Sequence, residues 1–393
     1  MSDQLKVMCV LGTRPEAIKL APVIRELRSR PDRFELHVCS TGQHRQMLDQ
    51  VLELFSIQPD IDLRVMSSGQ SPVAAAGLIL QRLDPVLAEF NPDWLLVQGD
   101  TTTVAAAALA GFYRGIKVGH VEAGLRTNNR REPFPEEINR RVTSVLTERH
   151  FAPTILSRAN LLREGVKSSQ IVLTGNTGID ALHWAVTTPA PENAERLVPQ
   201  AGRKLILVTV HRRENFGAPL REILSALRKL ANQFKDEIQI LLPVHLNPQV
   251  QAPIRSALEG LDNVTLTDPL DYRSLIYALE HCAFVLTDSG GLQEEAPALG
   301  KPVLVLRDVT ERPEAVAAGM ARLVGMRQKT IIAETERLLL DPTAGEDMLR
   351  HGNPFGDGFA AERIVASLSE EPLIEFAAEP AETAPLAGAT CPA

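Results

Sequence analysis

Short apolar runs alternate with longer amphipathic stretches along almost the whole chain. The runs are rich in Val, Ile and Leu at both odd and even positions, which is typical of strands buried on both faces of a sheet. Segments of helical length, roughly ten to twenty residues, separate the runs. The predicted strands lie at residues 6–11, 34–40, 93–98, 116–121, 204–210, 238–244, 263–266, 283–287 and 302–306.

This alternation predicts an α/β fold with two doubly wound parallel sheets wrapped by helices. The chain has 393 residues, and one hydrophobic core rarely grows past ~250–300 residues, so two domains are expected. A loop-like composition at 187–203 marks the junction, and we place the functional boundary earlier, with domains at 1–170 and 171–356. The segment 370–393 is rich in Ala, Pro, Glu and Thr and is predicted to be a disordered tail.

Charge and cysteine content exclude several classes of protein. The chain carries 41 basic and 49 acidic residues, a net charge of −8, which argues against duplex nucleic acid as a partner. Cys9, Cys39, Cys282 and Cys391 stand far apart and suggest neither a zinc site nor a disulfide framework. The first apolar run reads as a strand rather than a signal peptide, and no run is long enough to span a membrane. We therefore expect a cytoplasmic protein.

Ligands in such folds bind beyond the carboxyl ends of the strands, so the residues after each strand are the candidates. In the first half, Arg14 and Lys19 place two cations near a helix start, where the helix dipole disfavours them unless an anion is bound. Asp100, Glu122 and Glu136 put three carboxylates on the same edge. Ordinary alternatives are an N-cap for Asp100 and first-turn electrostatics for Glu136.

The second half offers the opposite polarity at its strand ends. Two glycines after the strand at 283–287 let backbone N–H groups approach an anion, and the helix that follows adds its positive end. Glu295 stands about one turn into that helix and can accept hydrogen bonds from ribose hydroxyls. The residues of this half that suit a phosphorylated ligand are His211, Arg212, His245, Ser289, Gly290, Gly291, Glu295 and Arg312.

Several common motifs are absent from the sequence. No Gly-x-Gly-x-x-Gly follows the first strand, and neither a Walker loop nor a His-Glu-x-x-His motif occurs, so no dinucleotide cofactor and no metal are expected. A nucleophile elbow would need a glycine at the position of Thr287. The sequence thus predicts a carboxylate-bearing first domain and a phosphate-binding second domain.

At this point the chain resembles the non-hydrolysing UDP-N-acetylglucosamine 2-epimerases, from about residue 5 to residue 369. Together the motifs are far more specific than any one of them. The six motifs that carry the resemblance are, in order, Gly12-Thr13-Arg14-Pro15-Glu16-Ala17-Ile18-Lys19, Gly99-Asp100-Thr101-Thr102-Thr103, His120-Val121-Glu122-Ala123-Gly124-Leu125-Arg126-Thr127, Pro135-Glu136-Glu137, His211-Arg212-Arg213-Glu214-Asn215 and Asp288-Ser289-Gly290-Gly291.

The resemblance implies a GT-B-type architecture, with two Rossmann-like domains, a cleft between them, a C-terminal helix at about 357–369 that packs back on the first domain, and a homodimer. It implies reversible interconversion of UDP-GlcNAc and UDP-ManNAc, with elimination of UDP to 2-acetamidoglucal and re-addition. It also implies a place in polysaccharide biosynthesis and no cofactor.

By position, the resemblance gives catalytic roles to Asp100, Glu122, Glu136 and His211. It implies UDP contacts for Arg14, Lys19, Ser289, Gly290, Gly291, Glu295 and Arg312. Regulated members of the family bind a second UDP-GlcNAc as effector, and the residues that match that site are Gln43, Gln46, Arg212 and His245. Gly69 stands where those members carry Arg. The spacing does not decide which carboxylate removes the C2 proton.

Four other functions remain open on the sequence. A hydrolysing 2-epimerase would release ManNAc and UDP, and related epimerases act on a UDP-2,3-diacetamido uronic acid sugar. A glycosyltransferase of the same architecture would share the UDP-binding residues but need an acceptor. A non-catalytic nucleotide-sugar sensor would not need the three carboxylates and His211.

Overall fold

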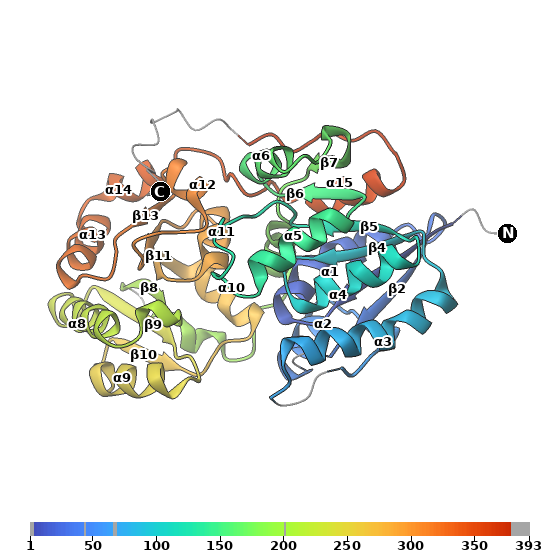
Figure 1. Cartoon of the computed structure of the whole chain (residues 1–393). Helices are drawn as coiled ribbons and strands as arrows, with labels where there is room; N and C mark the ends of the chain where they lie inside the picture. Colours follow the sequence, from blue (N-terminus) through green and yellow to red (C-terminus); the bar gives the residue numbers. More distant parts are fainter. Residues whose placement is uncertain (1–3, 43–44, 66–68, 200–201, 379–393) are drawn as a thin grey trace. The chain divides into compact units, whose positions relative to one another are not determined.

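The computed structural model describes residues 4–42, 45–65, 69–199 and 202–378, which form two compact units (Figure 1). The first unit comprises the described residues up to Trp184 together with Phe355–Ala377, and the second comprises Ala185–Pro354. The first unit extends beyond the expected boundary at residue 170 because strand β7 (Ile171–Leu173) completes its sheet.

The first sheet is parallel throughout, with the strand order β3-β2-β1-β4-β5-β6-β7. The order reverses between β1 and β4, and in open α/β sheets such a reversal opens a crevice that binds ligands. The other strands of this sheet are β1 (Leu5–Leu11), β2 (Phe34–Ser40), β3 (Ile61–Asp62), β4 (Trp94–Gln98), β5 (Lys117–Val121) and β6 (Arg149–Ala152).

The helices of the first unit form two groups. Helices α3, α4 and α5 pack side by side, over a core that contains Leu83, Leu95 and Val118. Helix α1 packs against α2 and against α15, which comes from the far end of the chain (Figure 1). The helices are α1 (Arg14–Arg28), α2 (Arg45–Leu54), α3 (Pro72–Phe90), α4 (Thr102–Tyr113), α5 (Glu136–Leu146), α6 (Ile155–Arg163), α7 (Thr177–Thr187) and α15 (Ala360–Leu368).

The second sheet is also parallel throughout, with the order β10-β9-β8-β11-β12-β13 and its reversal between β8 and β11. The strands are β8 (Lys204–Thr209), β9 (Ile238–Pro243), β10 (Val264–Thr267), β11 (Cys282–Thr287), β12 (Val303–Val305) and β13 (Ala321–Leu323).

Helix α8 packs between α9 and α13, and their apolar faces share one buried core with the strands beneath. The helices of this unit are α8 (Ala218–Gln233), α9 (Pro248–Leu258), α10 (Tyr272–His281), α11 (Gly290–Ala298), α12 (Pro313–Ala317), α13 (Gln328–Leu340) and α14 (Pro342–Met348). Short 3₁₀ turns occur in the chain at Ser168–Gln170, Ala194–Leu197 and Arg213–Asn215.

The predicted fold class is confirmed: both units are α/β domains with parallel, doubly wound sheets. All nine predicted strands are present, and the first sheet adds β3, β6 and β7 while the second adds β13. Both sheets follow the strand order of Rossmann-like domains.

Residues 371–376, at the start of the segment predicted to be a disordered tail, make contacts with the first unit. Glu371 pairs with Arg30 and Arg33, and Glu375 accepts hydrogen bonds from Arg158 and from the backbone of Leu173. The ring of Phe376 is buried because this segment runs along the end of β7. Residues 379–393 lie outside the described residues.

The described part of the chain contains no helix that combines the length and the apolar character needed to cross a membrane.

Candidate active site

The turns that follow β1 and β4 are tied together by a buried carboxylate. Glu16 Oε2 accepts hydrogen bonds from the backbone N–H groups of Gly12 (2.6 Å) and Thr13 (2.8 Å), and Glu16 Oε1 accepts one from the Thr101 hydroxyl. Thr13 in turn caps α1, which completes a capping box. Burial raises the pKa of Glu16 to about 7, although the hydrogen bonds oppose this shift. The two strand-end turns are therefore fixed to each other.

Two predicted cations stand on the first turns of α1. Arg14 is its first residue, and the half-buried side chain makes no hydrogen bond or ion pair with another described residue. Lys19 lies one turn further along, and its ammonium pairs with the Glu122 carboxylate. The sequence predicted a bound phosphate near these cations, and the structure shows that Lys19 pairs with a carboxylate of the chain.

Asp100 is the second residue after β4, and its side chain is held by α5. Its Oδ2 accepts hydrogen bonds from Arg140, with Oδ2 2.9 Å from Nε and 2.7 Å from one terminal nitrogen. The Asn139 amide donates to the Asp100 backbone carbonyl at 2.8 Å. The carboxylate is thus fixed in direction while a quarter of its side chain stays exposed (26%).

Glu122 directly follows β5, and its backbone adopts the left-handed region with φ of 65°. The side chain is buried, and it accepts hydrogen bonds from Lys19, Gln98 and Asn176. A Cβ atom added at Gly99 would lie 3.8 Å from Glu122 Oε2. The Glu122 carboxylate therefore lies beside the turn that carries Asp100.

Glu136 begins α5, one helical turn before the arginine that holds Asp100. Its Oε2 is buried and has no hydrogen-bond partner among the described residues. The neighbouring Glu137 is fully buried and accepts backbone hydrogen bonds from Thr127 and Asn128. Burial alone would raise the pKa of Glu137, but these hydrogen bonds and two arginines of α5 hold it below its usual value. Glu137 thus anchors the loop before α5. Asp100 and Glu122 follow neighbouring strands of the first sheet, and Glu136 begins the helix that holds Asp100.

A histidine–aspartate pair occupies the reversal point of the second sheet. His211 Nδ1 lies 3.0 Å from Asp288 Oδ1, and the backbone N–H groups of His211 and Arg212 donate to the same carboxylate. The Asn215 amide donates to Asp288 Oδ2 at 2.8 Å. Burial raises the pKa of Asp288, but the His211 and backbone hydrogen bonds outweigh it and hold this pKa below its usual value. Asp288 therefore fixes the His211 ring, a role that the sequence did not assign.

The N-terminus of α11 lies at the same reversal point. Gly290 and Gly291 open the helix, and the N-cap Ser289 makes no side-chain capping hydrogen bond. A Cβ atom added at Gly290 would lie 3.3 Å from Glu311 Oε1, so this helix start is closely approached by a carboxylate. Glu295 lies in the second turn of α11, half-buried.

Each predicted cation of this unit is paired with a carboxylate of the unit itself. Arg212 donates to Glu311 Oε1 at 2.7 Å, and Glu311 also pairs with Arg307. Burial would raise the pKa of Glu311, but the two guanidinium groups lower it to about 2. Arg312 pairs with Glu294. The guanidinium groups are thus oriented before any ligand arrives.

The residues that match the effector site fall on both units. Gln43 and the side chain of Gln46 lie outside the described residues. His245 is exposed after β9, and its ring centre lies 6.1 Å from that of His211. The fourth residue is Arg212, whose pairing with Glu311 is described above.

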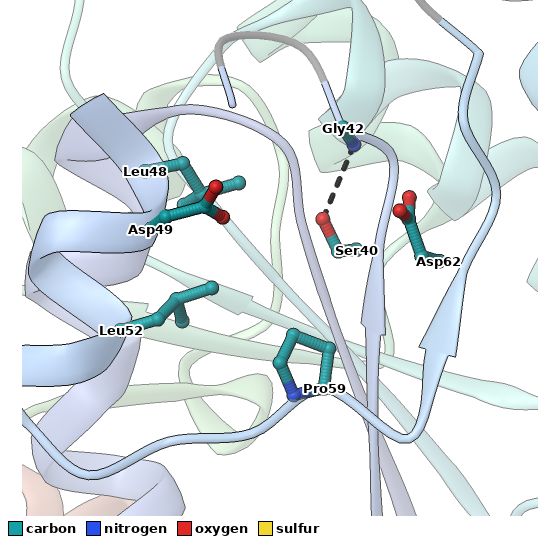
Figure 2. A pocket seen from close by; sticks show the side chains of 7 residues that line it. All are labelled: Ser40, Gly42, Leu48, Asp49, Leu52, Pro59 and Asp62. Atoms are coloured by element: carbon teal, nitrogen blue, oxygen red, sulfur yellow. Dashed lines mark hydrogen bonds between the residues drawn. The ribbon is translucent and has the colours of Figure 1, made fainter. Parts of the chain in front are cut away.

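A small pocket opens beside the end of β2 in the first unit (Figure 2). Figure 2 shows Leu48, Asp49 and Leu52 on α2 facing Ser40 and Asp62. Its volume of about 190 Å³ is below the ~300–1,000 Å³ typical of small-molecule sites. Gly42 also lines the pocket, which is too small for a nucleotide sugar.

Among the described residues, the structure shows neither a metal-binding cluster nor an exposed thiol. Within the described ranges, no three His, Cys, Asp or Glu side chains are grouped so that they could hold a metal ion. Cys9, Cys39 and Cys282 are buried free thiols, and burial raises the pKa of each to about 12.

Comparisons with known proteins agree with this arrangement. The sequence model of the family described as UDP-N-acetylglucosamine 2-epimerase matches residues 25–369. A UDP-N-acetylglucosamine 2-epimerase of Yersinia pestis is 53% identical over 371 residues, which cover 93% of this chain and 98% of the relative. The chain is also similar to a Bacillus subtilis protein of the same name, at 48% identity over 366 residues, covering 93% of this chain and 95% of that protein.

Solved structures show the same likeness. The UDP-GlcNAc 2-epimerase of Neisseria meningitidis bound to UDP-GlcNAc has a TM-score of 0.87 and 47% identity, with 93% of this chain and 100% of that chain covered. The Methanocaldococcus jannaschii enzyme in complex with UDP-GlcNAc and UDP has a TM-score of 0.76 and 33% identity, with the same coverage.

Proposed function

The chain belongs to the UDP-N-acetylglucosamine 2-epimerase family, and from this premise we propose that it interconverts UDP-GlcNAc and UDP-ManNAc. The six motifs in the sequence and the names of the relatives support the same substrate. We assign the nucleotide diphosphate to residues of the second unit and the chemistry on the hexose to the carboxylates of the first.

The second unit offers several donors to the diphosphate. Backbone N–H groups at the start of α11 and its positive helix end suit phosphate oxygens. His211, Arg212 and Arg312 add charged or polar donors that are already oriented by acidic partners. Glu295 accepts hydrogen bonds from the ribose hydroxyls. Arg14 of the first unit contributes a further guanidinium for the diphosphate.

The reaction needs positive charge at C1 of the hexose. The proton on C2 has no adjacent carbonyl and is a poor acid. Stretching the C1–O bond builds oxocarbenium character, which acidifies the C2–H bond. The C1–O electron pair leaves with the UDP β-phosphate, a carboxylate takes the C2 proton, and a C1–C2 double bond forms in 2-acetamidoglucal.

Re-addition reverses these events on the other face. UDP attacks C1, and a proton is delivered to the opposite face of C2. Atoms and electrons balance without an oxidant or reductant. Asp100, Glu122 and Glu136 supply the negative charge and the proton-transfer groups, and two of them can serve the two faces of C2.

One observation carries this proposal: each sheet holds a different set of fixed groups at its strand ends. Asp100 and Glu122 stand at strand ends of the first sheet, and the glycine-led helix start and His211 stand at the reversal point of the second. An elimination of UDP needs both sets.

The reaction is tested by incubating the protein with UDP-GlcNAc in heavy water and recording proton NMR spectra. We expect a UDP-ManNAc fraction and deuterium at C2 of both sugars. Epimerisation with the C2 hydrogen retained would contradict proton transfer. Release of free ManNAc with UDP would instead identify a hydrolysing enzyme.

The variant Asp100→Asn tests whether Asp100 acts in turnover and not in UDP binding. This variant should bind UDP as the wild type does but lose roughly 10²–10⁴-fold in turnover, as expected when an acid–base group is removed. Asp84→Asn is the matched control, because Asp84 is an exposed residue of α3 that pairs only with Arg114 in the described contacts. Weak UDP binding by Asp100→Asn together with normal turnover would reverse the assignment.

Two further properties implied by the family are proposed with their tests. A homodimer would have twice the 43.0 kDa chain mass in sedimentation equilibrium, and a chain mass at working concentration would contradict it. Activation by a second UDP-GlcNAc would give a sigmoidal rate against UDP-GlcNAc concentration. A hyperbolic rate from UDP-ManNAc without effector would argue against it.

A further inference from the structure

Three side chains from three different elements converge on the Glu122 carboxylate. Lys19 of α1 and Asn176, which precedes α7, donate to Oε1, with the Asn176 amide at 3.1 Å. Gln98, the last residue of β4, donates to Oε2 at 2.5 Å. Gln98 and Asn176 are 2% and 3% exposed, so these amides are part of the protein interior.

The orientation of the Asn176 amide is fixed by a second hydrogen bond. Its Oδ1 accepts the backbone N–H of Gly178 at 2.9 Å, and an N–H group cannot accept a hydrogen bond. The Nδ2 group must therefore face Glu122. Since the Lys19 ammonium also has only donors, Glu122 Oε1 receives two donors, an arrangement that suits an ionised carboxylate.

The backbone of Glu122 adds an independent observation. A φ of 65° is unfavourable for a residue with a side chain. Such a backbone conformation is kept only where the surrounding contacts impose it, and it often occurs at functional sites. Gly99, whose φ is 84°, lies beside this carboxylate: a Cβ atom there would be in ordinary van der Waals contact with Glu122 Oε2, at 3.8 Å.

We propose that Gln98 and Asn176 are positioning residues that act through Glu122: they fix the direction of its carboxylate and favour its ionised form. The inference rests on the proposed epimerase function. In the reaction, a Glu122 held in this way stays negatively charged beside the developing oxocarbenium ion instead of turning away or taking up a proton.

The other charged or titratable groups around Glu122 are few. Lys19 faces it from α1, and Asp100 stands in the turn after β4. His120 on β5 is buried against the Gly99 carbonyl at 2.8 Å, and burial lowers its pKa to about 4, so it is neutral near pH 7. The two amides thus supply neutral hydrogen bonds that do not change with pH.

The sharpest test is Asn176→Asp. The new carboxylate keeps an oxygen for the Gly178 N–H, but it removes the donor to Glu122 and places a second negative charge against it. We expect kcat to fall roughly ten- to a hundredfold, since hydrogen bonds to charged groups are worth this much. The KM for UDP-GlcNAc and the affinity for UDP should stay within about twofold, because one hydrogen bond away from the nucleotide is changed.

The matched control is Asn263→Asp in the second unit. Asn263 is equally buried (2%), and its amide donates to the carbonyls of Ala231 and Ile238. This variant should lose stability without a selective loss of kcat per folded molecule. If Asn176→Asp keeps normal kcat, or loses UDP binding together with kcat, the positioning role is wrong.

A second experiment exchanges the side chains of Gln98 and Glu122 in the double variant Gln98→Glu with Glu122→Gln. The exchange restores an amide–carboxylate pair in the same space, so the free energy of unfolding should exceed that of Gln98→Glu alone. Turnover should stay at least tenfold below the wild type because the charge has moved. Restored turnover would show that the pair is only structural and would overturn the proposal. Wild-type protein that does not epimerise UDP-GlcNAc would refute the proposed function itself, independently of these variants.

Discussion

Glu16 should make the first unit less stable as the pH rises through neutrality. Its carboxyl group is buried between the turns after β1 and β4, and burial raises its pKa to about 7. A carboxyl group with a raised pKa in the folded state contributes stability below its unfolded pKa, and this contribution is lost as the pH rises through the folded pKa. Replacing Glu16 by Gln removes the ionisation but keeps the shape.

The size of the effect follows from the two pKa values. With 4.5 for the unfolded chain and about 7 for the folded protein, ionisation of Glu16 costs about 2.5 kcal/mol more at pH 8 than at pH 5. The Gln side chain can still accept the N–H groups of Gly12 and Thr13 and donate to the Thr101 hydroxyl. The variant should therefore be nearly as stable as the wild type at pH 5 and more stable at pH 8.

The assay is urea unfolding at the two pH values, followed by tryptophan fluorescence. Both tryptophans, Trp94 and Trp184, belong to the first unit, so the signal reports this unit. Asp180 also has a raised pKa of about 7, but it is present in both proteins and cancels in the comparison. Glu137→Gln is the control of opposite sign, because the pKa of Glu137 is lowered. Equal pH dependence of wild type and Glu16→Gln would refute the reasoning.

Three other changes should have distinct effects. Asp288→Asn removes the carboxylate that fixes His211 and should lower kcat about 100-fold, while UDP binding measured by calorimetry stays within a few fold; unchanged kcat would contradict this. Phe376→Ala should destabilise the first unit by about 3 kcal/mol in urea unfolding, and no loss would mean that the 370–378 segment does not contribute to its stability. Gly124→Ala places a Cβ atom 2.3 Å from the Ser157 carbonyl at a φ of 91°, and it should cost at least ~3 kcal/mol in the same assay; a smaller loss would show that the chain relaxes there.

The sequence predicted the fold well wherever strands are central. The apolar runs of β1, β4, β8 and β11 are continuous because helices cover both faces of these strands, and their observed ends lie within two residues of the predicted ones. The strands that the sequence missed lie toward the sheet edges and have two to four residues each, as in β3 (Ile61–Asp62). A segment this short carries no measurable periodicity.

The residues of the candidate site were predicted by their position after strands, and their partners were not. Nothing in the sequence pairs Glu122 with Asn176, which is 54 residues away, or His211 with Asp288, which is 77 residues away. Lys19 is an example of a predicted site residue whose partner the sequence did not identify. Its place near a helix start led to the prediction of a bound phosphate, and only the fold shows that Lys19 pairs with the Glu122 carboxylate.

The strand order of each sheet explains how these groups meet their partners. At a reversal of strand order, the two central strands come from segments far apart in the chain, and their ends meet at one edge of the sheet. A charged group at one strand end can then be fixed by a buried partner from the other, as Asp288 after β11 fixes His211 after β8. In the first sheet, Gln98 at the end of β4 fixes Glu122 after the neighbouring strand β5. Groups fixed before the substrate binds need no reorganisation in the transition state, which is where electrostatic catalysis gains most. The proposed elimination of UDP develops both signs of charge, and it would therefore draw on groups that are fixed in this way.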